Sequence, residues 1–147
     1  DLMAAIGQIV RQRIPVLGIC LGHQALARAF GAELRQLSAP LHGHPTMLTV
    51  TDAGDLLLQK VAPPLIVGRY HSWVVDPDSM PEELIASSHD ETGHIMSFYH
   101  RNLPIHGVQF HPESCISNCG SALIRNWLAT CCRHPLRERS LRKFPDL

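Results

Sequence analysis

Cys20 is the residue of this sequence best placed for nucleophilic chemistry. An apolar run over residues 15–19 precedes it, a helical pattern over residues 21–30 follows it, and Gly18 and Gly22 flank it as G-x-C-x-G. This spacing is typical of a nucleophile elbow, a tight strand-to-helix turn where bulky neighbours would collide. There the helix N-terminus favours the thiolate, and the backbone N–H of Leu21 can stabilise an oxyanion. A buried structural cysteine beside two turn glycines is the alternative.

A second pair of residues, His111 and Glu113, could supply the base that a thiolate nucleophile needs. They follow the apolar segment 105–110, and Pro112 between them keeps His111 extended. Residues i and i+2 of an extended segment point the same way, so the carboxylate can hold the imidazole tautomer. By itself, His-Pro-Glu could instead end a strand and cap the next helix.

The elbow and the His-Pro-Glu segment together predict acyl transfer through a thioester. The ends of parallel strands lie along one edge of a sheet, so Cys20 and His111 can be neighbours although 90 residues separate them. Cys20 would attack a carboxamide, and His111 would protonate the leaving ammonia and then activate water.

Three motifs, GICLGHQ at 18–24, Tyr70-His-Ser72 and GVQFHPES at 107–114, occur in an order that resembles a class I glutamine amidotransferase domain. The similarity covers residues 14–128 and is greatest to the subunits that serve anthranilate or aminodeoxychorismate synthase. It implies L-glutamine as substrate, with Gln24 as a glutamine contact and with Ser72 and Trp73 holding the substrate's α-amino and carboxylate groups through their backbone. It also implies a chorismate-using synthase, separate or fused, as the partner that receives the ammonia.

The elements that must position these residues predict an α/β fold. Helices are expected over residues 2–12, 22–30, ended by Gly31, and 117–132, capped by Ser117 or Asn118; strands are expected over 15–19, 33–37, 47–51, 65–70, 84–88, 94–99 and 105–110. The last two strands should pair as a hairpin. We expect a three-layer sandwich on a mostly parallel sheet, similar to class I amidotransferases and flavodoxin.

The chain opens with a helix whose apolar face already needs a sheet. The resemblance implies a strand-helix-strand portion before it, with a Pro-Gly-rich loop that supplies a second oxyanion donor, and we expect the fold to lack this portion. Residues 1–132 are therefore expected to be an N-terminally incomplete amidotransferase domain. Residues 133–147, with five basic and two acidic residues, are expected to be a solvated basic tail or linker.

Composition argues against several other classes of protein. Thirteen basic residues balance thirteen acidic ones, so no overall field favours nucleic acid. No apolar run is long enough for a membrane span. Five cysteines without a C-x-x-C pair indicate reduced thiols in a cytoplasmic protein. The ten histidines match no structural zinc spacing, so we expect neither a metal nor another cofactor.

Three further hypotheses stay open at this point. The chain could be a truncated, non-catalytic remnant that only binds or regulates a synthase, since loss of an oxyanion donor costs about 10²–10³ in rate. It could be an amidotransferase for another acceptor, as in GMP or carbamoyl phosphate synthesis, or another cysteine hydrolase. In the turn 41–45, His44 stands where close relatives often have lysine, in a face thought to contact the synthase.

Overall fold

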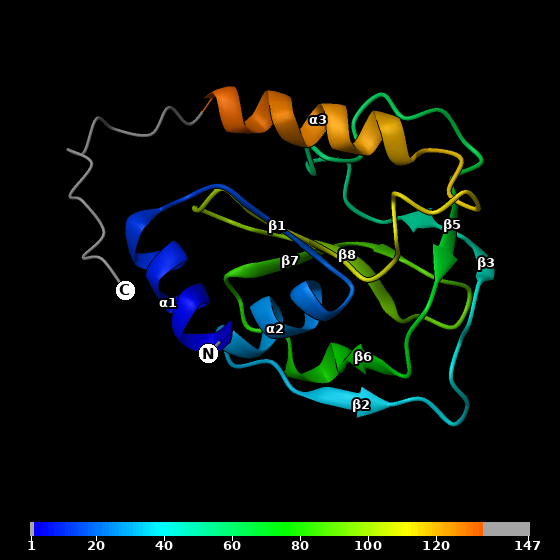
Figure 1. The fold of residues 1–147 in the computed structure, drawn as a ribbon, viewed down its shortest axis with the longest axis horizontal. Helices are drawn as coiled ribbons and strands as arrows, with labels where there is room; N and C mark the ends of the chain where they lie inside the picture. The colour runs from blue at the N-terminus through cyan, green and yellow to red at the C-terminus, as the bar shows by residue number, and fades with distance from the viewer. Residues whose placement is uncertain (1, 134–147) are drawn as a thin grey trace, which may run out of the picture.

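A five-stranded sheet forms the centre of the molecule (Figure 1). The computed structural model describes residues 2–133, so all but the first residue of the predicted basic tail lies outside them. The elements are α1 (Leu2–Gln12), β1 (Val16–Ile19), α2 (Leu21–Ala29), β2 (Leu34–Gln36), β3 (His44–Met47), β4 (Thr49–Val50), β5 (Ile66–Arg69), β6 (Trp73–Val75), a 3-10 turn (Pro77–Ser79), β7 (Leu84–His89), β8 (Ile95–His100), β9 (Ile105–Val108) and α3 (Gly120–Arg133).

The strand order of the central sheet is β1-β9-β8-β7-β4. Strands β1 and β9 pair in parallel with Val16 opposite Ile105, and the β9–β8, β8–β7 and β7–β4 pairs are antiparallel. The expected hairpin is β8–β9. Two small sheets, β2–β6 and β3–β5, flank this centre. The α/β class is confirmed, and the parallel pair is the one that carries both candidate catalytic motifs.

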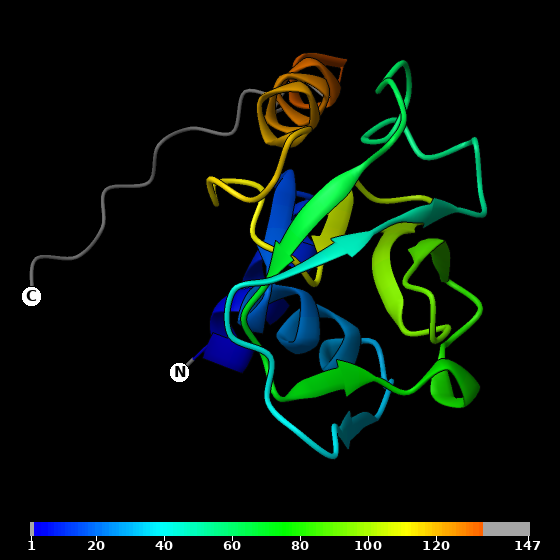
Figure 2. The same ribbon diagram turned by 90° about the vertical axis from the view of Figure 1, so that its right-hand side faces the viewer.

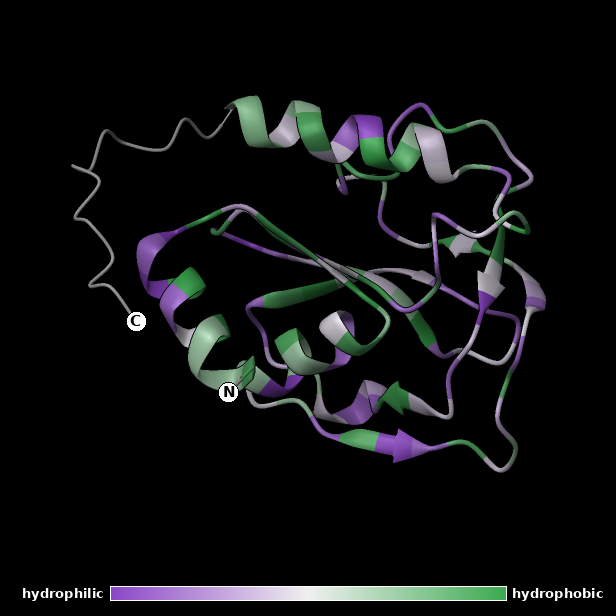
Figure 3. Ribbon diagram, in the orientation of Figure 1, coloured by the Kyte–Doolittle hydropathy of each residue, from purple (hydrophilic) through white to green (hydrophobic). Residues whose placement is uncertain are grey.

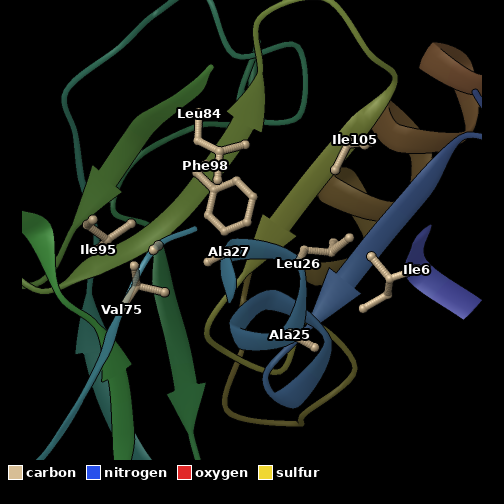
Figure 4. Close-up of a cluster of buried hydrophobic side chains, with 10 residues drawn as sticks. Ile6, Ala25, Leu26, Ala27, Val75, Leu84, Ile95, Phe98 and Ile105 are labelled. Atoms are coloured by element: carbon tan, nitrogen blue, oxygen red, sulfur yellow. The ribbon is translucent and has the colours of Figure 1, made fainter. Parts of the chain in front are cut away.

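Helices cover both faces of the sheet, which gives the predicted three layers (Figures 1 and 2). On one face α1 and α2 pack through Ile6, Leu26 and Ala27 against Phe98 and Ile105 of the sheet (Figure 4). The opposite face packs against α3 and the chain before β5, in a second buried cluster: Leu48, Leu57, Leu58, Leu65, Val67, Met96, Val108, Phe110, Cys119 and Leu123. Alternation along β9 supplies both clusters, because successive side chains point to opposite faces.

Helix α3 begins at Gly120, three residues later than predicted. Ser117 and Asn118 do not cap it: the Ser117 hydroxyl accepts from Gly68 N (3.0 Å), and Asn118 Oδ1 accepts from Ile66 N (2.9 Å). Both side chains therefore tie the loop before α3 to β5. Hydrophobic and hydrophilic residues are interspersed along α3 (Figure 3). The buried Leu123 packs with the sheet in the second cluster. Across residues 2–133, no helix is long and apolar enough to cross a membrane.

Candidate active site

Cys20 occupies the sharp turn between β1 and α2. Its backbone has φ 51° and ψ −101°, a conformation that is unfavourable for a residue with a side chain. The Cys20 N–H donates to the Val108 carbonyl at 2.8 Å, which continues the parallel pairing by one residue. A strained residue at the C-terminal end of a parallel strand, directly before a helix, is the geometry of the predicted nucleophile elbow.

The two glycines of the G-x-C-x-G motif have different steric roles. A Cβ on Gly18 would lie 2.5 Å from Leu26 Cδ1 and 2.6 Å from the Gly22 backbone, so β1 and α2 can approach only with glycine there. A Cβ on Gly22 would meet no atom within 4 Å. The expectation that both flanking positions exclude larger residues is therefore correct for Gly18 and wrong for Gly22.

The thiol of Cys20 is half-buried, and this decides its protonation. Burial raises the pKa of Cys20 above its ordinary value; the Leu21 backbone N–H lowers it, and the charge of Glu113 raises it further. The N–H at the start of α2 favours the thiolate, as expected, but desolvation of the charged sulfur outweighs this effect. The resting group is a thiol, which donates to the Tyr70 carbonyl at 3.9 Å.

His111 and Glu113 form a hydrogen-bonded pair at the C-terminal end of β9. The distance from His111 Nδ1 to Glu113 Oε1 is 2.6 Å. Partial burial would raise the pKa of Glu113, but the hydrogen bond from His111 lowers it below its ordinary value. The expectation that residues two apart meet on one side is met by this pair. Nδ1 thus faces the carboxylate and leaves Nε2 to exchange a proton with another group.

Strand β5 fixes the backbone of His111. The His111 N–H donates to the Gly68 carbonyl at 3.0 Å, and the Ser117 hydroxyl donates to the His111 carbonyl at 2.6 Å. The ring of Tyr70 packs edge-on against the His111 ring, with centroids 5.3 Å apart, and its hydroxyl is 3.1 Å from Ser114 Oγ. Tyr70 thus contacts His111 through its ring and Cys20 through its carbonyl.

Cys20 directly follows β1, and His111 lies three residues after the adjacent parallel strand β9, at the same edge of the sheet. The register of β1 and β9, extended by one residue, places Cys20 beside Gln109, two residues before His111. The carbonyl and ring of Tyr70 lie against the sulfur and the imidazole, respectively. This edge carries a thiol, an imidazole and a carboxylate, the groups that nucleophilic acyl transfer requires.

The residues expected to bind glutamine lie next to this edge. Gln24, buried on α2, donates from Nε2 to the Trp73 carbonyl at 2.8 Å and to Gln109 Oε1 at 3.0 Å. Ser72 is half-buried, and its carbonyl accepts from Leu37 N at 2.8 Å. The Trp73 indole is 44% exposed. Gln24 and Trp73 are therefore joined to each other, and both N–H groups of the Gln24 amide already have partners.

Behind Trp73 lies a buried series of hydrogen-bonded side chains that ends in an ion pair. It was not predicted from the sequence. His71 Nδ1 lies 2.9 Å from the Trp73 carbonyl, Arg69 Nε donates to His71 Nε2 at 3.0 Å, and Arg69 forms an ion pair with Asp90 at 2.6 Å. Burial, followed by the charge of Arg69, lowers the pKa of His71 to about 4, so the ring is neutral. A charged Arg69 inside an apolar strand was the available signal, since buried charges are paired.

Gln109 was also missed, although it sits inside one of the recognised motifs. It is fully buried, and its Nε2 donates to Cys20 Sγ at 3.8 Å. A polar residue on the α2 side of an otherwise apolar strand needs a buried partner, and this is the signal that could have identified it.

Side chains that could ligate a metal ion do not cluster in the described part of the chain. Within residues 2–133, no three His, Cys, Asp or Glu side chains gather closely enough to hold an ion. Cys119 packs in the cluster under α3, whereas Cys115 is exposed.

Comparison with known proteins relates the chain to glutamine-using enzymes. The profile of the family "Glutamine amidotransferase class-I" matches residues 1–131. The aminodeoxychorismate synthase component 2 of Escherichia coli is 44% identical over 116 residues, which are 79% of this chain and 61% of that protein. The anthranilate synthase component 2 of Mycobacterium tuberculosis is 44% identical over 118 residues, 80% of this chain and 50% of that one. The chain thus spans between half and about three-fifths of these relatives.

Solved structures show the same fold. A Thermoplasma acidophilum protein assigned as a component of GMP synthase superposes with a TM-score of 0.81 at 26% identity, over 90% of this chain and 65% of that one. A glutamine amidotransferase of Thermotoga maritima superposes with a TM-score of 0.65 at 22% identity, over 90% of this chain and 53% of that one. The fold, the motifs and the matched profile agree: the chain belongs to the class I glutamine amidotransferases.

Proposed function

We propose that this chain hydrolyses L-glutamine to glutamate and ammonia through a thioester on Cys20. The observation that carries the proposal is the edge where Cys20, at the strained turn after β1, lies beside the strand that ends in the His111–Glu113 pair. Family membership supplies the substrate class.

The proposed reaction uses each group in turn. His111 takes the thiol proton of Cys20, and the thiolate adds to the side-chain carboxamide carbon of glutamine. The Leu21 N–H at the start of α2 stabilises the oxyanion. His111 returns the proton to the nitrogen, and the C–N bond breaks to release ammonia. Water, activated by His111, then cleaves the thioester to give glutamate and the free thiol. Glu113 holds the imidazole and balances its charge.

The curated relatives support a proposal for the enzyme that receives the ammonia. Those described above are components of aminodeoxychorismate and anthranilate synthases, and a Thermotoga maritima relative, 39% identical, is a bifunctional protein. We therefore propose a chorismate-using synthase, separate or fused, as partner. Exposed apolar side chains of Leu21, Tyr70 and Trp73 lie around the site and suit such a contact. Glutamine turnover should be weak alone and strongly activated by the synthase with its acceptor bound; equal turnover in both states contradicts this partner.

A glutamine-mimicking electrophile tests the nucleophile directly. Although the chain has five cysteines, peptide mass spectrometry should find the label only on Cys20, and excess glutamine should protect it. Cys20→Ala should abolish both labelling and glutamate release, because the alanine methyl group cannot form the thioester. Cys119→Ala, in the α3 cluster, is the matched control and should keep both. Absence of labelling at Cys20 would instead favour a non-catalytic remnant.

A further inference from the structure

Two buried side-chain amides connect the Trp73 backbone with the sulfur of Cys20. Gln24 Nε2 donates to the Trp73 carbonyl at 2.8 Å and to Gln109 Oε1 at 3.0 Å, and Gln109 Nε2 donates to Cys20 Sγ at 3.8 Å. Gln24 comes from α2 and Gln109 from the end of β9. The link therefore joins the segment proposed to hold glutamine to the proposed nucleophile, from two different elements.

The direction of every hydrogen bond in this link is fixed. A backbone carbonyl can only accept, so Gln24 must turn its NH₂ group toward Trp73. The same nitrogen also faces Gln109, which must then present its carbonyl oxygen. The Gln109 NH₂ group is consequently left facing the sulfur. An amide flipped at either glutamine would place two donors or two acceptors against each other, which is unfavourable in a buried position.

The Trp73 carbonyl is itself held by a second donor. Arg69 has only donors, so His71 must accept at Nε2 and carry its proton on Nδ1, which points at the same carbonyl at 2.9 Å. Arg69 is held in turn by an ion pair with the buried Asp90. The carbonyl therefore cannot rotate without breaking hydrogen bonds from two side chains.

We infer that Gln109 is a catalytic residue that donates a hydrogen bond to the sulfur of Cys20 and stabilises its thiolate, and that Gln24 is the positioning residue that fixes the Gln109 amide. The inference rests on the proposed role of Cys20 as nucleophile. Gln24 uses both of its N–H groups within the protein, so a contact with glutamine would fall to its side-chain oxygen. The N–H of Gln109 offsets part of the desolvation that the half-buried sulfur suffers on ionising.

The link also makes the nucleophile sensitive to the position of the glutamine-binding segment. Displacement of the Trp73 carbonyl would release Gln24, and a released Gln24 no longer specifies which end of the Gln109 amide faces the sulfur. The reactivity of Cys20 should thus depend on residues that lie beyond contact with it.

The pH dependence of Cys20 alkylation by iodoacetamide tests the inference, with the modified peptide followed by mass spectrometry in the full chain. Gln109→Leu removes the donor and should raise the midpoint by about 0.5–1 pH unit, which corresponds to a 3- to 10-fold slower reaction at neutral pH. Gln24→Met leaves Gln109 in place but frees its amide, and should shift the midpoint in the same direction by a smaller amount. Circular dichroism establishes that each variant is folded.

Ser88→Ala is the matched control, since it removes a buried hydrogen bond to Ser97 (2.6 Å) elsewhere in the same sheet and should leave the midpoint unchanged. If Gln109→Leu does not fold, Gln24→Met decides. A midpoint that stays at the wild-type value in the folded variants, or that moves equally in Ser88→Ala, overturns the inference. Alkylation needs no glutamine, so a shifted midpoint without labelling by a glutamine mimic would refute the proposed function and leave the Gln109–Cys20 interaction intact.

Discussion

At the scale of single residues, neighbouring groups have opposing effects on the pKa of Cys20. Burial and the charge of Glu113 disfavour the thiolate, whereas the Leu21 N–H favours it, and the pKa of Cys20 ends above its ordinary value. A thiol at rest avoids side reactions of a permanently charged nucleophile. In the proposed mechanism deprotonation must therefore accompany attack, so the rate should depend on His111 and its orienting carboxylate.

Glu113→Gln tests this dependence on the base. The amide keeps the size of the side chain but loses the charge that holds His111 Nδ1 at 2.6 Å. We expect kcat for glutamine hydrolysis to fall by roughly 10²-fold with little change in KM, because the interaction gains strength only when the imidazole is charged. Glu91→Gln, an exposed carboxylate in the β7–β8 turn, is the control. Wild-type turnover by Glu113→Gln would remove Glu113 from the mechanism.

The turn at Cys20 and the contact between His111 and Glu113 could be predicted from the sequence because each depends on neighbouring residues, whereas their proximity to each other depends on the pairing of β1 with β9. The glycine spacing specifies the turn at Cys20, and i, i+2 alternation specifies the His111–Glu113 contact. The contacts of Gln24 and Gln109 depend on how α2 lies over β9, which no local spacing contains. The same holds for Arg69 of β5 and Asp90, which directly follows β7, 21 residues along the chain.

At the scale of elements, the close approach of β1 and α2 makes the elbow possible, and the two motif glycines can be separated experimentally. Gly18→Ala should lower the free energy of unfolding by about 1–3 kcal/mol, because its methyl would overlap Leu26 and the Gly22 backbone. Gly22→Ala, the matched control within α2, should change it by no more than about 1 kcal/mol, with stabilisation expected from the better helix propensity. Urea unfolding measures both; equal losses would show that the approach of β1 and α2 is not limiting.

Element positions were predicted best where periodicity was long. Helix α1 has the predicted bounds, and α2 differs by one residue at each end. The β8–β9 hairpin was also predicted. The predicted start of α3 is too early, because Ser117 and Asn118 are residue types that often cap helices. In the structure both side chains bind the β5 backbone instead. A cap and a loop tether use the same side-chain chemistry, and only tertiary contacts distinguish them.

At the scale of the whole molecule, the sheet carries two kinds of pairing with different consequences. The parallel pair β1–β9 brings two strand ends to one edge and so assembles the site. The antiparallel β9–β8–β7–β4 portion extends the core, and its buried Phe98 packs against His23 beneath α2, with ring centroids 4.6 Å apart. Stability of this core and geometry of the site are therefore coupled through α2, which carries His23 and Gln24 and begins directly after Cys20.

Buried neutral histidines should make the whole fold sensitive to acid. Burial lowers the pKa of His23 to about 3, with the Gly107 backbone offsetting a part, and the pKa of His71 to about 4. Unfolded histidine takes up its proton near pH 6.5, so the unfolded state binds more protons between these values. The stabilisation is complete above pH 6.5 and is lost as the pH falls, by up to about 1.4 kcal/mol per pH unit for each residue.

Urea unfolding at pH 7, 6 and 5 measures this loss, and one variant identifies its source. The two ring nitrogens of His23 make no hydrogen bond of normal geometry among residues 2–133. His23→Leu removes this imidazole and should reduce by about half the loss of unfolding free energy between pH 7 and pH 5. His42→Gln changes an exposed imidazole that water solvates in both states, and its decline should match that of the wild type. A decline that His23→Leu leaves unchanged would place the acid sensitivity elsewhere. With the flattening observed, the helix that begins directly after Cys20 would also be the element through which low pH unfolds the protein.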